Sequence, residues 1–506
     1  MLGAAITWVA EWAPTILAVL APLSAVFTTT HIVLHKRETR SAIGWIGLSW
    51  LVPFIGSALY LMLGVNRIRR RAVELRGDRS AYAFRDARSA SFNPGLDGEA
   101  AESAPSEYCV EGSTGRSYLP VDVAHLGGLI RVVNEVATRP LLTSNNVDVL
   151  FNGEQAYPAM LKAIGEAKTS IALSSFIFDN DKWGRIFADA LAEASERGVA
   201  VRVLVDAAGL HYSFPSIMGY LRRKKVRAAR FLPQIFPPHL MTANLRNHRK
   251  ILVVDGQIGF TGGMNIRTSH MLEEPSKQPT KDIHFRLAGP VVSHLQEVFV
   301  DDWNFATGEE LRGTKWFPAP KPAGKLLARG IADGPDDNLD KMPWMLLGAI
   351  TAARESIRIV TPYFLPDPSL IDALNLAAMR GVEVDVIMPG KNNLPYVQWA
   401  SFGLMRPLLQ FGCRAWLTAP PFEHSKVMVV DRHWMVFGSS NWDPRSHRLN
   451  FEFDVECYDG ELAGRLDDWA CAKLEDATQI TLEDYDKRGF WRQLRDGTFR
   501  LMSPYL

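Results

Sequence analysis

The chain has 506 residues, of which 47% are hydrophobic, and its formal net charge is +1 at pH 7. This length and apolar content suffice for a substantial buried core. The near-neutral charge argues against a protein that binds nucleic acid through global basicity. The cysteines are scattered without a C-x-x-C pair, which indicates neither a disulfide framework nor a zinc site and is compatible with a reducing compartment: Cys109, Cys413, Cys457 and Cys471.

Two apolar stretches near the amino terminus, residues 13–34 and 43–63, are each close to the about 20 residues that a bilayer requires. We expect residues 1–72 to form a membrane anchor with two transmembrane helices. Pro53 does not exclude the second helix, because proline is tolerated in membrane helices. A cleaved signal peptide is the alternative, but the start lacks a basic segment and a second stretch follows at once.

Basic residues suggest how the anchor is oriented. They are more numerous after the second stretch than in the loop between the two, so the positive-inside rule places the catalytic region and both termini in the cytoplasm. A collar of arginines that faces lipid headgroups is the alternative. The residues compared are Arg67, Arg69, Arg70, Arg71 and Arg76 after the second stretch, and Lys36, Arg37 and Arg40 in the loop.

Residues 73–125 are interpreted as a linker region, since residues 86–107 are rich in Ser, Ala, Gly and acidic side chains. Further along, residues 230–245 are apolar and interrupted by prolines. This segment is expected either to dip into lipid or to pack as a loop on its domain. The basic residues around its start either hold anionic headgroups or form a solvated helix end: Arg222, Arg223, Lys224, Lys225, Arg227 and Arg230.

One sequence pattern occurs twice. H-R-K-I-L-V-V-D begins at His248 and H-S-K-V-M-V-V-D at His424, and each is followed by a small-residue turn that ends in asparagine, at Asn265 and Asn441. The offsets agree, because 424 − 248 = 176 and 441 − 265 = 176. Upstream, S-I-A-L-S-S-F-I-F matches S-I-R-I-V-T-P-Y-F. Such fixed offsets indicate an internal repeat.

Each copy of the repeat alternates apolar strands with helices. This pattern predicts two tandem α/β domains with buried sheets, related by a pseudo-twofold, at residues 126–320 and 321–506. Two unrelated α/β domains are the alternative, and the shared offsets argue against it.

Within each motif the histidine and the lysine are two residues apart, so their side chains share one face of a strand. The aspartate has the opposite parity and stands where the strand ends. We therefore expect it to hold the hairpin or a neighbouring basic group and not to touch substrate. The candidate catalytic residues of the two motifs are His248, Lys250, Asp255, His424, Lys426 and Asp431.

The returning strands carry small residues and an asparagine back beside the histidine and lysine face. Small residues at such a place let a ligand approach the backbone closely. We expect Gly263, Ser439, Asn265 and Asn441 to bind substrate.

Two histidines, two lysines and two asparagines without a metal cage fit the chemistry of a phosphodiester. The lysines and amides neutralise the non-bridging oxygens as charge builds in the transition state. One neutral imidazole attacks phosphorus, and the other, protonated, gives its proton to the departing alcohol. We assign the nucleophile to His248 and the acid/base role to His424, although the pseudo-twofold allows the inverse. No metal and no cofactor are expected.

A nucleophilic histidine also needs its far nitrogen held. Each half offers a carboxylate downstream of its histidine: Asp282 at 282 − 248 = 34 residues and Glu452 at 452 − 424 = 28 residues. This spacing pairs each histidine with the carboxylate of its own half.

Three polar residues near the motifs are not counted among the site residues, and two of them, His270 and His433, are interpreted as incidental. Glu423 either favours protonation of the histidine that follows it or is a solvated or structural acid, and strand alternation favours the second interpretation. His270 and His433 are left outside the site.

The duplicated motif resembles that of the phospholipase D superfamily, and the surrounding stretches are similar to bacterial cardiolipin synthases over nearly the whole chain. The resemblance implies that two phosphatidylglycerol molecules give cardiolipin and glycerol through a phosphatidyl-histidine intermediate. It also implies one site shared by two facing halves, and a multi-pass protein of the bacterial inner membrane. The matching stretches include R-N-H-R-K-I-L-V-V-D-G, F-T-G-G-M-N-I, T-P-Y-F-L-P-D, G-S-S-N-W-D-P-R-S and L-N-F-E-F-D-V-E-C-Y-D.

Other functions remain open at this stage. A phospholipase D-type hydrolase, or a transphosphatidylase that uses another phospholipid such as phosphatidylethanolamine, needs the same motif. A nuclease would also use it, but the apolar stretches and the near-neutral charge argue against nucleic acid. A non-enzymatic lipid-binding scaffold is disfavoured because both motifs are intact. The oligomeric state is left open, with a homo-oligomer among the possibilities.

Overall fold

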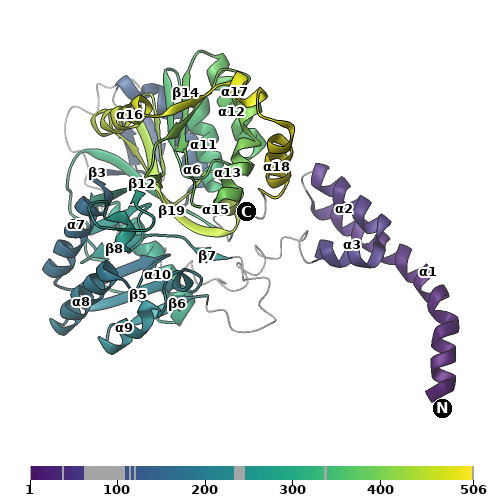
Figure 1. The fold of residues 1–506 in the computed structure, drawn as a ribbon. Helices are drawn as coiled ribbons and strands as arrows, with labels where there is room; N and C mark the ends of the chain where they lie inside the picture. Colours follow the sequence, from purple (N-terminus) through teal and green to yellow (C-terminus); the bar gives the residue numbers. More distant parts are fainter. Residues whose placement is uncertain are drawn as a thin grey trace. The chain divides into compact units, whose positions relative to one another are not determined.

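The computed structural model describes residues 2–36, 39–61, 109–112, 115–118, 121–232, 245–335 and 339–503. The described residues form two compact units, one of N-terminal helices and one from Cys109 onwards, and each is considered by itself (Figure 1). Residues 86–107, and 233–244 of the proline-interrupted segment, lie outside the described residues. The linker and lipid-dipping expectations therefore stay predictions.

The N-terminal unit contains three helices: α1 (Leu2–His35), α2 (Thr39–Leu51) and α3 (Pro53–Leu59). Among the described residues, one helical stretch, Leu17–His35, is long and apolar enough to cross a membrane. The single helix expected at 43–63 is instead divided. Pro53 has no N–H to donate, and Val52 before it leaves the helical region with φ −137° and ψ 75°. The second transmembrane helix is not confirmed.

The second unit begins with a small antiparallel pair, β1 (Cys109–Gly112) and β2 (Gly115–Tyr118). The elements of the first repeat follow: η5 (Val121–Leu126), α6 (Gly127–Val136), β3 (Leu142–Phe151), α7 (Asn152–Glu166), β4 (Ser170–Ser175), α8 (Lys182–Glu196), β5 (Ala200–Asp206), η6 (Gly209–Tyr212), α9 (Ile217–Arg223), β6 (Ala228–Phe231), β7 (Arg246–Asn247), β8 (Ile251–Val254), β9 (Ile258–Gly262), η8 (Thr268–His270), β10 (Thr280–Lys281), β11 (Ile283–Ala288) and α10 (Val292–Thr307).

The second repeat continues to the carboxyl terminus. Its elements are β12 (Leu326–Asp333), α11 (Lys341–Ala352), β13 (Ser356–Val360), α12 (Pro368–Met379), β14 (Glu383–Pro389), α13 (Pro395–Phe402), α14 (Met405–Leu409), β15 (Arg414–Thr418), β16 (Phe422–Glu423), β17 (Val427–Val430), β18 (Trp434–Gly438), α15 (Pro444–Arg448), β19 (Asn450–Tyr458), α16 (Gly460–Glu475), β20 (Thr478–Ile480), α17 (Leu482–Asp486) and α18 (Phe490–Leu501).

One large sheet runs through both repeats, in the strand order β20-β15-β14-β13-β17-β18-β19-β12-β3-β11-β9-β8-β4-β5-β6, with β7 beside β19. In the first repeat, β4, β5 and β6 are parallel and β8, β9 and β11 are antiparallel. The second repeat has the same arrangement in β13, β14, β15, β17, β18 and β19. The predicted α/β fold and internal repeat are confirmed. Because both repeats belong to one compact unit, the division into domains at residue 320 stays a prediction.

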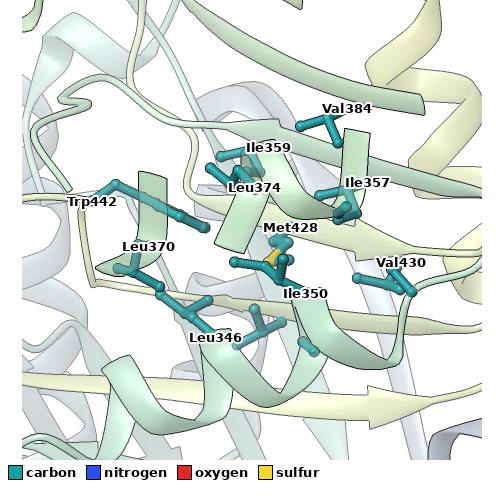
Figure 2. Close-up of a cluster of buried hydrophobic side chains, with 14 of the residues drawn as sticks. Leu346, Ile350, Ile357, Ile359, Leu370, Leu374, Val384, Met428, Val430 and Trp442 are labelled. Atoms are coloured by element: carbon teal, nitrogen blue, oxygen red, sulfur yellow. The ribbon is translucent and has the colours of Figure 1, made fainter. Parts of the chain in front are cut away.

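Apolar side chains between the sheet and its helices determine which face each strand turns inward. Figure 2 shows part of this core, in which α11 and α12 pack against β13, β14 and β17. On β17, Met428 and Val430 belong to this cluster, while Val427 and Val429 belong to the core on the other face. Lys426 stands two residues before Met428, so by the same alternation its side chain lies on the same face as that of Met428. The labelled residues are Leu346, Ile350, Ile357, Ile359, Leu370, Leu374, Val384, Met428, Val430 and Trp442.

Candidate active site

Both His/Lys motifs lie at the carboxyl ends of parallel strands. The end of β4 pairs with the start of β8 through Ser174 and Ile251, and the end of β13 pairs with the start of β17 through Val360 and Val427. Each motif lysine directly precedes the first residue of its strand, Lys250 before β8 and Lys426 before β17. The carboxyl edge of the parallel strands is where α/β proteins bind ligands.

The backbone just before each motif histidine pairs with a strand of the opposite repeat. β7 runs parallel to β19, and the His248 N–H donates to the carbonyl of Phe451 (2.9 Å). β16 runs parallel to β10, and the His424 N–H donates to the carbonyl of Lys281 (2.8 Å). The two repeats therefore exchange strand contacts at the site, which brings their motifs to one place.

This exchange decides which carboxylate holds which histidine. His248 Nδ1 lies 3.0 Å from Glu452 Oε2, and His424 Nδ1 lies 2.7 Å from Asp282 Oδ2. Both predicted carboxylates thus contact a motif histidine. The predicted pairing within each half is wrong, because each histidine is held by the other half. Since a carboxylate only accepts, Nδ1–H is the donor in each ring, and Nε2 is the nitrogen that does not contact the carboxylate.

The two histidines are neutral in the ligand-free site. Burial lowers the pKa of His248, and burial together with Lys426 and Lys250 lowers the pKa of His424 well below its usual value. Burial raises the pKa of Glu452, but the nearby His248 and Lys250 outweigh it and lower the pKa to about 2. Glu452 is therefore a firmly ionised acceptor for the Nδ1–H of His248.

The second carboxylate is less acidic than the first. Burial raises the pKa of Asp282 to about 6, against the attraction of Lys426. His424 also differs from His248 at its other nitrogen, because Lys426 Nζ donates to His424 Nε2 at 3.1 Å. The two halves of the site are therefore related in fold but unequal in electrostatics.

Both motif lysines are buried and their charges repel. Burial lowers the pKa of Lys250 to about 7 and that of Lys426 to about 8, and Lys426 adds to the lowering at Lys250. Each Nζ donates to the carbonyl of its own motif histidine, at 2.5 Å for His248 and 2.6 Å for His424. A bound anion would relieve both the desolvation and the repulsion, so this pair is suited to a phosphate.

The two predicted asparagines are buried beside the motifs. Asn265 Oδ1 accepts the N–H of Ile177 (3.0 Å), which leaves its amide –NH₂ as the donor end. The Asn441 N–H donates to Ser446 Oγ (3.1 Å). Their role in gripping phosphate stays a prediction.

Gly263 and Ser439 lie against the carboxylates. A Cβ on Gly263 would stand 2.3 Å from Asp282 Oδ1, so only glycine lets that carboxylate reach its histidine. Ser439 Oγ accepts the N–H of Phe453 (3.0 Å) and helps to lower the pKa of Glu452. These contacts support the carboxylates behind the histidines, and the expected role of Gly263 and Ser439 in substrate binding stays a prediction.

Asp255 and Asp431 hold the backbone at the start of the upstream strands, and not the hairpin that was expected as their partner. Asp255 Oδ1 accepts the N–H groups of Thr169 (2.7 Å) and Ser170 (3.0 Å). Asp431 does the same for the residues before β13, and it also bonds to His125 Nε2 (2.9 Å). They therefore support the motif strands and have no described contact with the histidines or lysines of the site.

His270, which was left outside the predicted site, lies at its wall. It is 2% exposed, and its ring centroid is 6.3 Å from that of His424. Its Nε2 accepts the Asn265 N–H (3.3 Å), as Ser446 does for Asn441 in the other repeat. His270 and Ser446 are 446 − 270 = 176 residues apart, which is the offset of the repeat. This offset was the sequence signal that the two positions are equivalent.

Aromatic rings complete the walls beside the histidines. The Phe176 ring lies 4.9 Å from that of His248 and 5.5 Å from Lys250 Nζ. The Tyr363 ring lies 6.5 Å from that of His424. Phe176 follows the end of β4 and Tyr363 follows the end of β13, in the matching stretches S-S-F-I-F and T-P-Y-F, but the two aromatic residues are not at equivalent positions of the match.

Buried ion pairs anchor the motif segments to the long helices. Arg249 bonds to Asp302 of α10 at 2.7 Å. Glu423 bonds to Ser425 Oγ (2.5 Å) and forms an ion pair with Lys473 of α16. Glu423 is thus structural, as favoured, and it is buried. In the described part of the chain, no group of three or more His, Cys, Asp or Glu is placed to hold a metal ion.

Two repeated α/β halves, each of which supplies a His/Lys motif and the carboxylate for the other's histidine, define a phospholipase D-like protein with one shared site. The chain belongs to the family described as cardiolipin synthase, PLD-like domain, whose family model matches residues 160–303 and 346–472. A phospholipase D-nuclease N-terminal family model matches residues 23–64.

Individual relatives cover nearly the whole chain. It is 28% identical over 496 residues to a cardiolipin synthase of Staphylococcus aureus (strain Mu50), covering 96% of this chain and 95% of that protein. It is 29% identical over 477 residues to the major cardiolipin synthase of Bacillus subtilis (strain 168), covering 94% and 95%. The crystal structure of phosphatidylserine synthase from Haemophilus influenzae Rd KW20 matches with a TM-score of 0.58 and 14% identity, over 75% of this chain and 100% of that one, which supports the fold alone.

Proposed function

We propose that this protein is a cardiolipin synthase that transfers a phosphatidyl group between two phosphatidylglycerol molecules, giving cardiolipin and glycerol. One observation carries the proposal: two histidines, each held at Nδ1 by a carboxylate of the other half, share one site with two buried lysines. This arrangement provides a nucleophile, an acid/base and cations for one phosphodiester. The family supplies the lipid class.

In the first step, Nε2 of His248 attacks phosphorus. The new N–P bond forms as the bond from phosphorus to the glycerol oxygen breaks, and Nε2–H of His424 gives its proton to that oxygen. Ionised Glu452 stabilises the positive charge that develops on His248. The negative charge of the bound phosphate offsets the positive charges of the two lysines, which otherwise lower the pKa of His424. The pKa of His424 therefore rises, and this histidine can carry the proton.

In the second step, a hydroxyl of the second phosphatidylglycerol gives its proton to Nε2 of His424. Its oxygen then attacks phosphorus, the N–P bond breaks, and cardiolipin leaves with His248 neutral again. Lys250, Lys426, Asn265 and Asn441 would neutralise the non-bridging oxygens in both steps.

The placement of the chain at the membrane belongs to the same proposal. We propose that residues 1–72 anchor it through two membrane-crossing segments, with α1 as the first and α2 together with α3 as the second. Residues 126–320 and 321–506 form the two catalytic domains, on the cytoplasmic side of a bacterial inner membrane. The arginines that follow the second apolar stretch support this side.

Lipid mass spectrometry tests the proposed reaction. The full chain in mixed micelles receives isotopically labelled phosphatidylglycerol, beside the His248→Ala/His424→Ala control. Labelled cardiolipin with free glycerol, absent in the control, is the expected result. Phosphatidic acid alone would make the protein a hydrolase, and a product formed only with added phosphatidylethanolamine would change the second substrate.

A further inference from the structure

The last described helix, α18, has an apolar face that the described chain does not cover. Its exposed apolar side chains include Phe490, 69% exposed, Trp491, 77% exposed, and Leu501, 75% exposed, with Leu494 between them. Positions 490, 494 and 501 are four and seven residues apart, which places them on one stripe of a helix with 3.6 residues per turn. The two rings at its start touch, with centroids 5.2 Å apart. α18 therefore displays an apolar stripe that begins with two aromatic rings.

The opposite face of α18 is fixed to the protein. Asp496 is buried and accepts from Arg488 (2.5 Å) and Arg495 (2.7 Å). The Phe499 ring packs on Trp399 of α13 with centroids 5.0 Å apart, and α18 lies along α13 in Figure 1. Because this face is docked, the apolar stripe is held outward and does not turn into the core.

The helix is also connected to the wall of the active site. Phe499 belongs to the same apolar cluster as Tyr363, together with Leu365 and Val397. Tyr363 is the residue whose ring lies beside that of His424. The apolar stripe is thus presented by a helix that packs against the active-site edge of the second half.

Aromatic residues are also exposed near the site in the first half. The Tyr212 ring lies 6.2 Å from that of Phe176, which in turn contacts His248. Tyr212 is exposed, and Phe214, two residues further on, is fully exposed. Aromatic side chains of this kind are enriched where proteins meet the membrane interface.

Charge favours one occupant for this surface. α18 carries three arginines and one aspartate in twelve residues. An amphipathic helix with arginines beside an apolar stripe that contains tryptophan is suited to the interface of a bilayer with anionic lipids. The proposed substrate, phosphatidylglycerol, is such a lipid.

We propose that the exposed face of α18 docks on an anionic lipid bilayer and so holds the active-site edge against the headgroup layer from which both substrates come. The choice of lipid rests on the proposed function. The docked face, the exposed stripe and the link to Tyr363 belong to the structure of α18 itself.

A position-specific probe tests the contact. Trp491→Cys, labelled with the fluorophore NBD in the full chain, is placed in vesicles of phosphatidylglycerol and phosphatidylcholine. The matched control is Met379→Cys, which is 58% exposed at the last turn of α12, where the chain returns to the start of β14 and so to the end of the sheet away from the site. The chain without a new cysteine gives the labelling background. Lipids that carry a quencher near the headgroup should quench position 491 strongly and position 379 little.

Each result of this experiment is decisive. Quenching of position 491 by aqueous iodide instead of by lipid would show a solvated face and overturn the proposal. Protection from both quenchers would show that protein covers the stripe, from a second copy or from elsewhere in the chain, and would overturn it equally. Lipid quenching without any cardiolipin synthesis would retain the docking and reject the proposed function.

Activity gives an independent measurement. The variant Phe490→Ser/Trp491→Ser/Leu494→Ser should lower the rate on phosphatidylglycerol in vesicles roughly tenfold and leave the rate on dispersed short-chain phosphatidylglycerol unchanged. Met379→Ser should change neither rate. Equal losses on both substrates, with an unfolding temperature unchanged from that of the native chain, would contradict docking.

Discussion

His248 and Glu452, which are 204 residues apart in the chain, meet with Nδ1 and Oε2 3.0 Å apart in the buried site. The reciprocal pair, His424 and Asp282, spans 142 residues and has 2.7 Å between Nδ1 and Oδ2. Neither half of the protein therefore contains a complete histidine and carboxylate pair. This reciprocity makes the two repeats one catalytic unit and leads to the first two predictions.

Glu452→Gln should lower the rate of phosphatidyl transfer by roughly 10²- to 10³-fold and should also lower the free energy of unfolding at pH 7, because the folded site favours the ionised carboxylate over a neutral group. The amide keeps the shape but no longer carries the charge that fixes the tautomer of His248 and stabilises its cation. Steady-state rates and thermal unfolding measure the two effects. Glu452→Asp, which retains the charge, should recover part of the rate, and failure of this rescue would argue against an electrostatic role.

The cross-half pairing and the order of the histidines can be tested together with a lipid phosphodiester that has a nitrophenol leaving group. Such a group needs no proton to depart, so the His424→Ala enzyme should still release one equivalent of nitrophenol in a burst and retain a phosphohistidine. Adding Glu452→Gln should slow this burst at least about tenfold, whereas adding Asp282→Asn should not. A burst that survives in His248→Ala and disappears in His424→Ala would invert the order.

Gly263→Ala should reduce activity by roughly 10- to 100-fold, because the added Cβ would stand 2.3 Å from the Asp282 carboxylate and push it from His424. The overpacking should also reduce the free energy of unfolding by about 1 to 3 kcal/mol. Gly165→Ala, in α7, is the control, since its Cβ would meet nothing within 4 Å. Equal activity in both variants would reject the role given to Gly263.

Lys250→Met should abolish transfer and yet stabilise the ligand-free protein by roughly 1 to 3 kcal/mol at pH 6. Burial lowers the pKa of Lys250 to about 7. Between this value and the unfolded value of about 10.4, the unfolded chain binds more protons, so the stability of the native enzyme rises with pH. The advantage of the methionine variant should therefore be full below pH 7 and shrink as the pH approaches 10.

Inorganic phosphate provides the control for that experiment. It should raise the unfolding temperature of the native enzyme more than that of Lys250→Met, because the anion binds the folded site through this cation. Equal stabilisation of both proteins would mean that phosphate binds elsewhere. Thermal unfolding across a pH series, with and without phosphate, measures both effects.

Some site features followed from local sequence alone. The two-residue spacing of histidine and lysine was enough to place them on one face, since strand alternation depends only on neighbours. Opposite parity and position at a strand end predicted a structural role for Asp255 and Asp431, but not that their partners would be backbone N–H groups before the upstream strands. The matched offsets were enough to predict the repeat that the sheet displays.

Other features were missed because they depend on distant contacts. Gly263 was expected to admit a ligand, which stays a prediction, and the sequence did not show that the carboxylate of Asp282 lies against it. His270 was set aside because nothing adjacent in the sequence shows that its ring lies beside His424. The break at Pro53 was underestimated, because apolar composition alone does not show where a helix loses its hydrogen bonds.

The sequence by itself determined the chemical groups of the site, their repetition and the face on which each histidine and lysine lies. Only the tertiary structure decided which carboxylate holds which histidine. That choice depends on backbone hydrogen bonds between β7 and β19 and between β10 and β16, which join short strands of opposite repeats. Such non-local pairing leaves no periodicity in either partner, so it is established only when the two halves of the sheet close around the site.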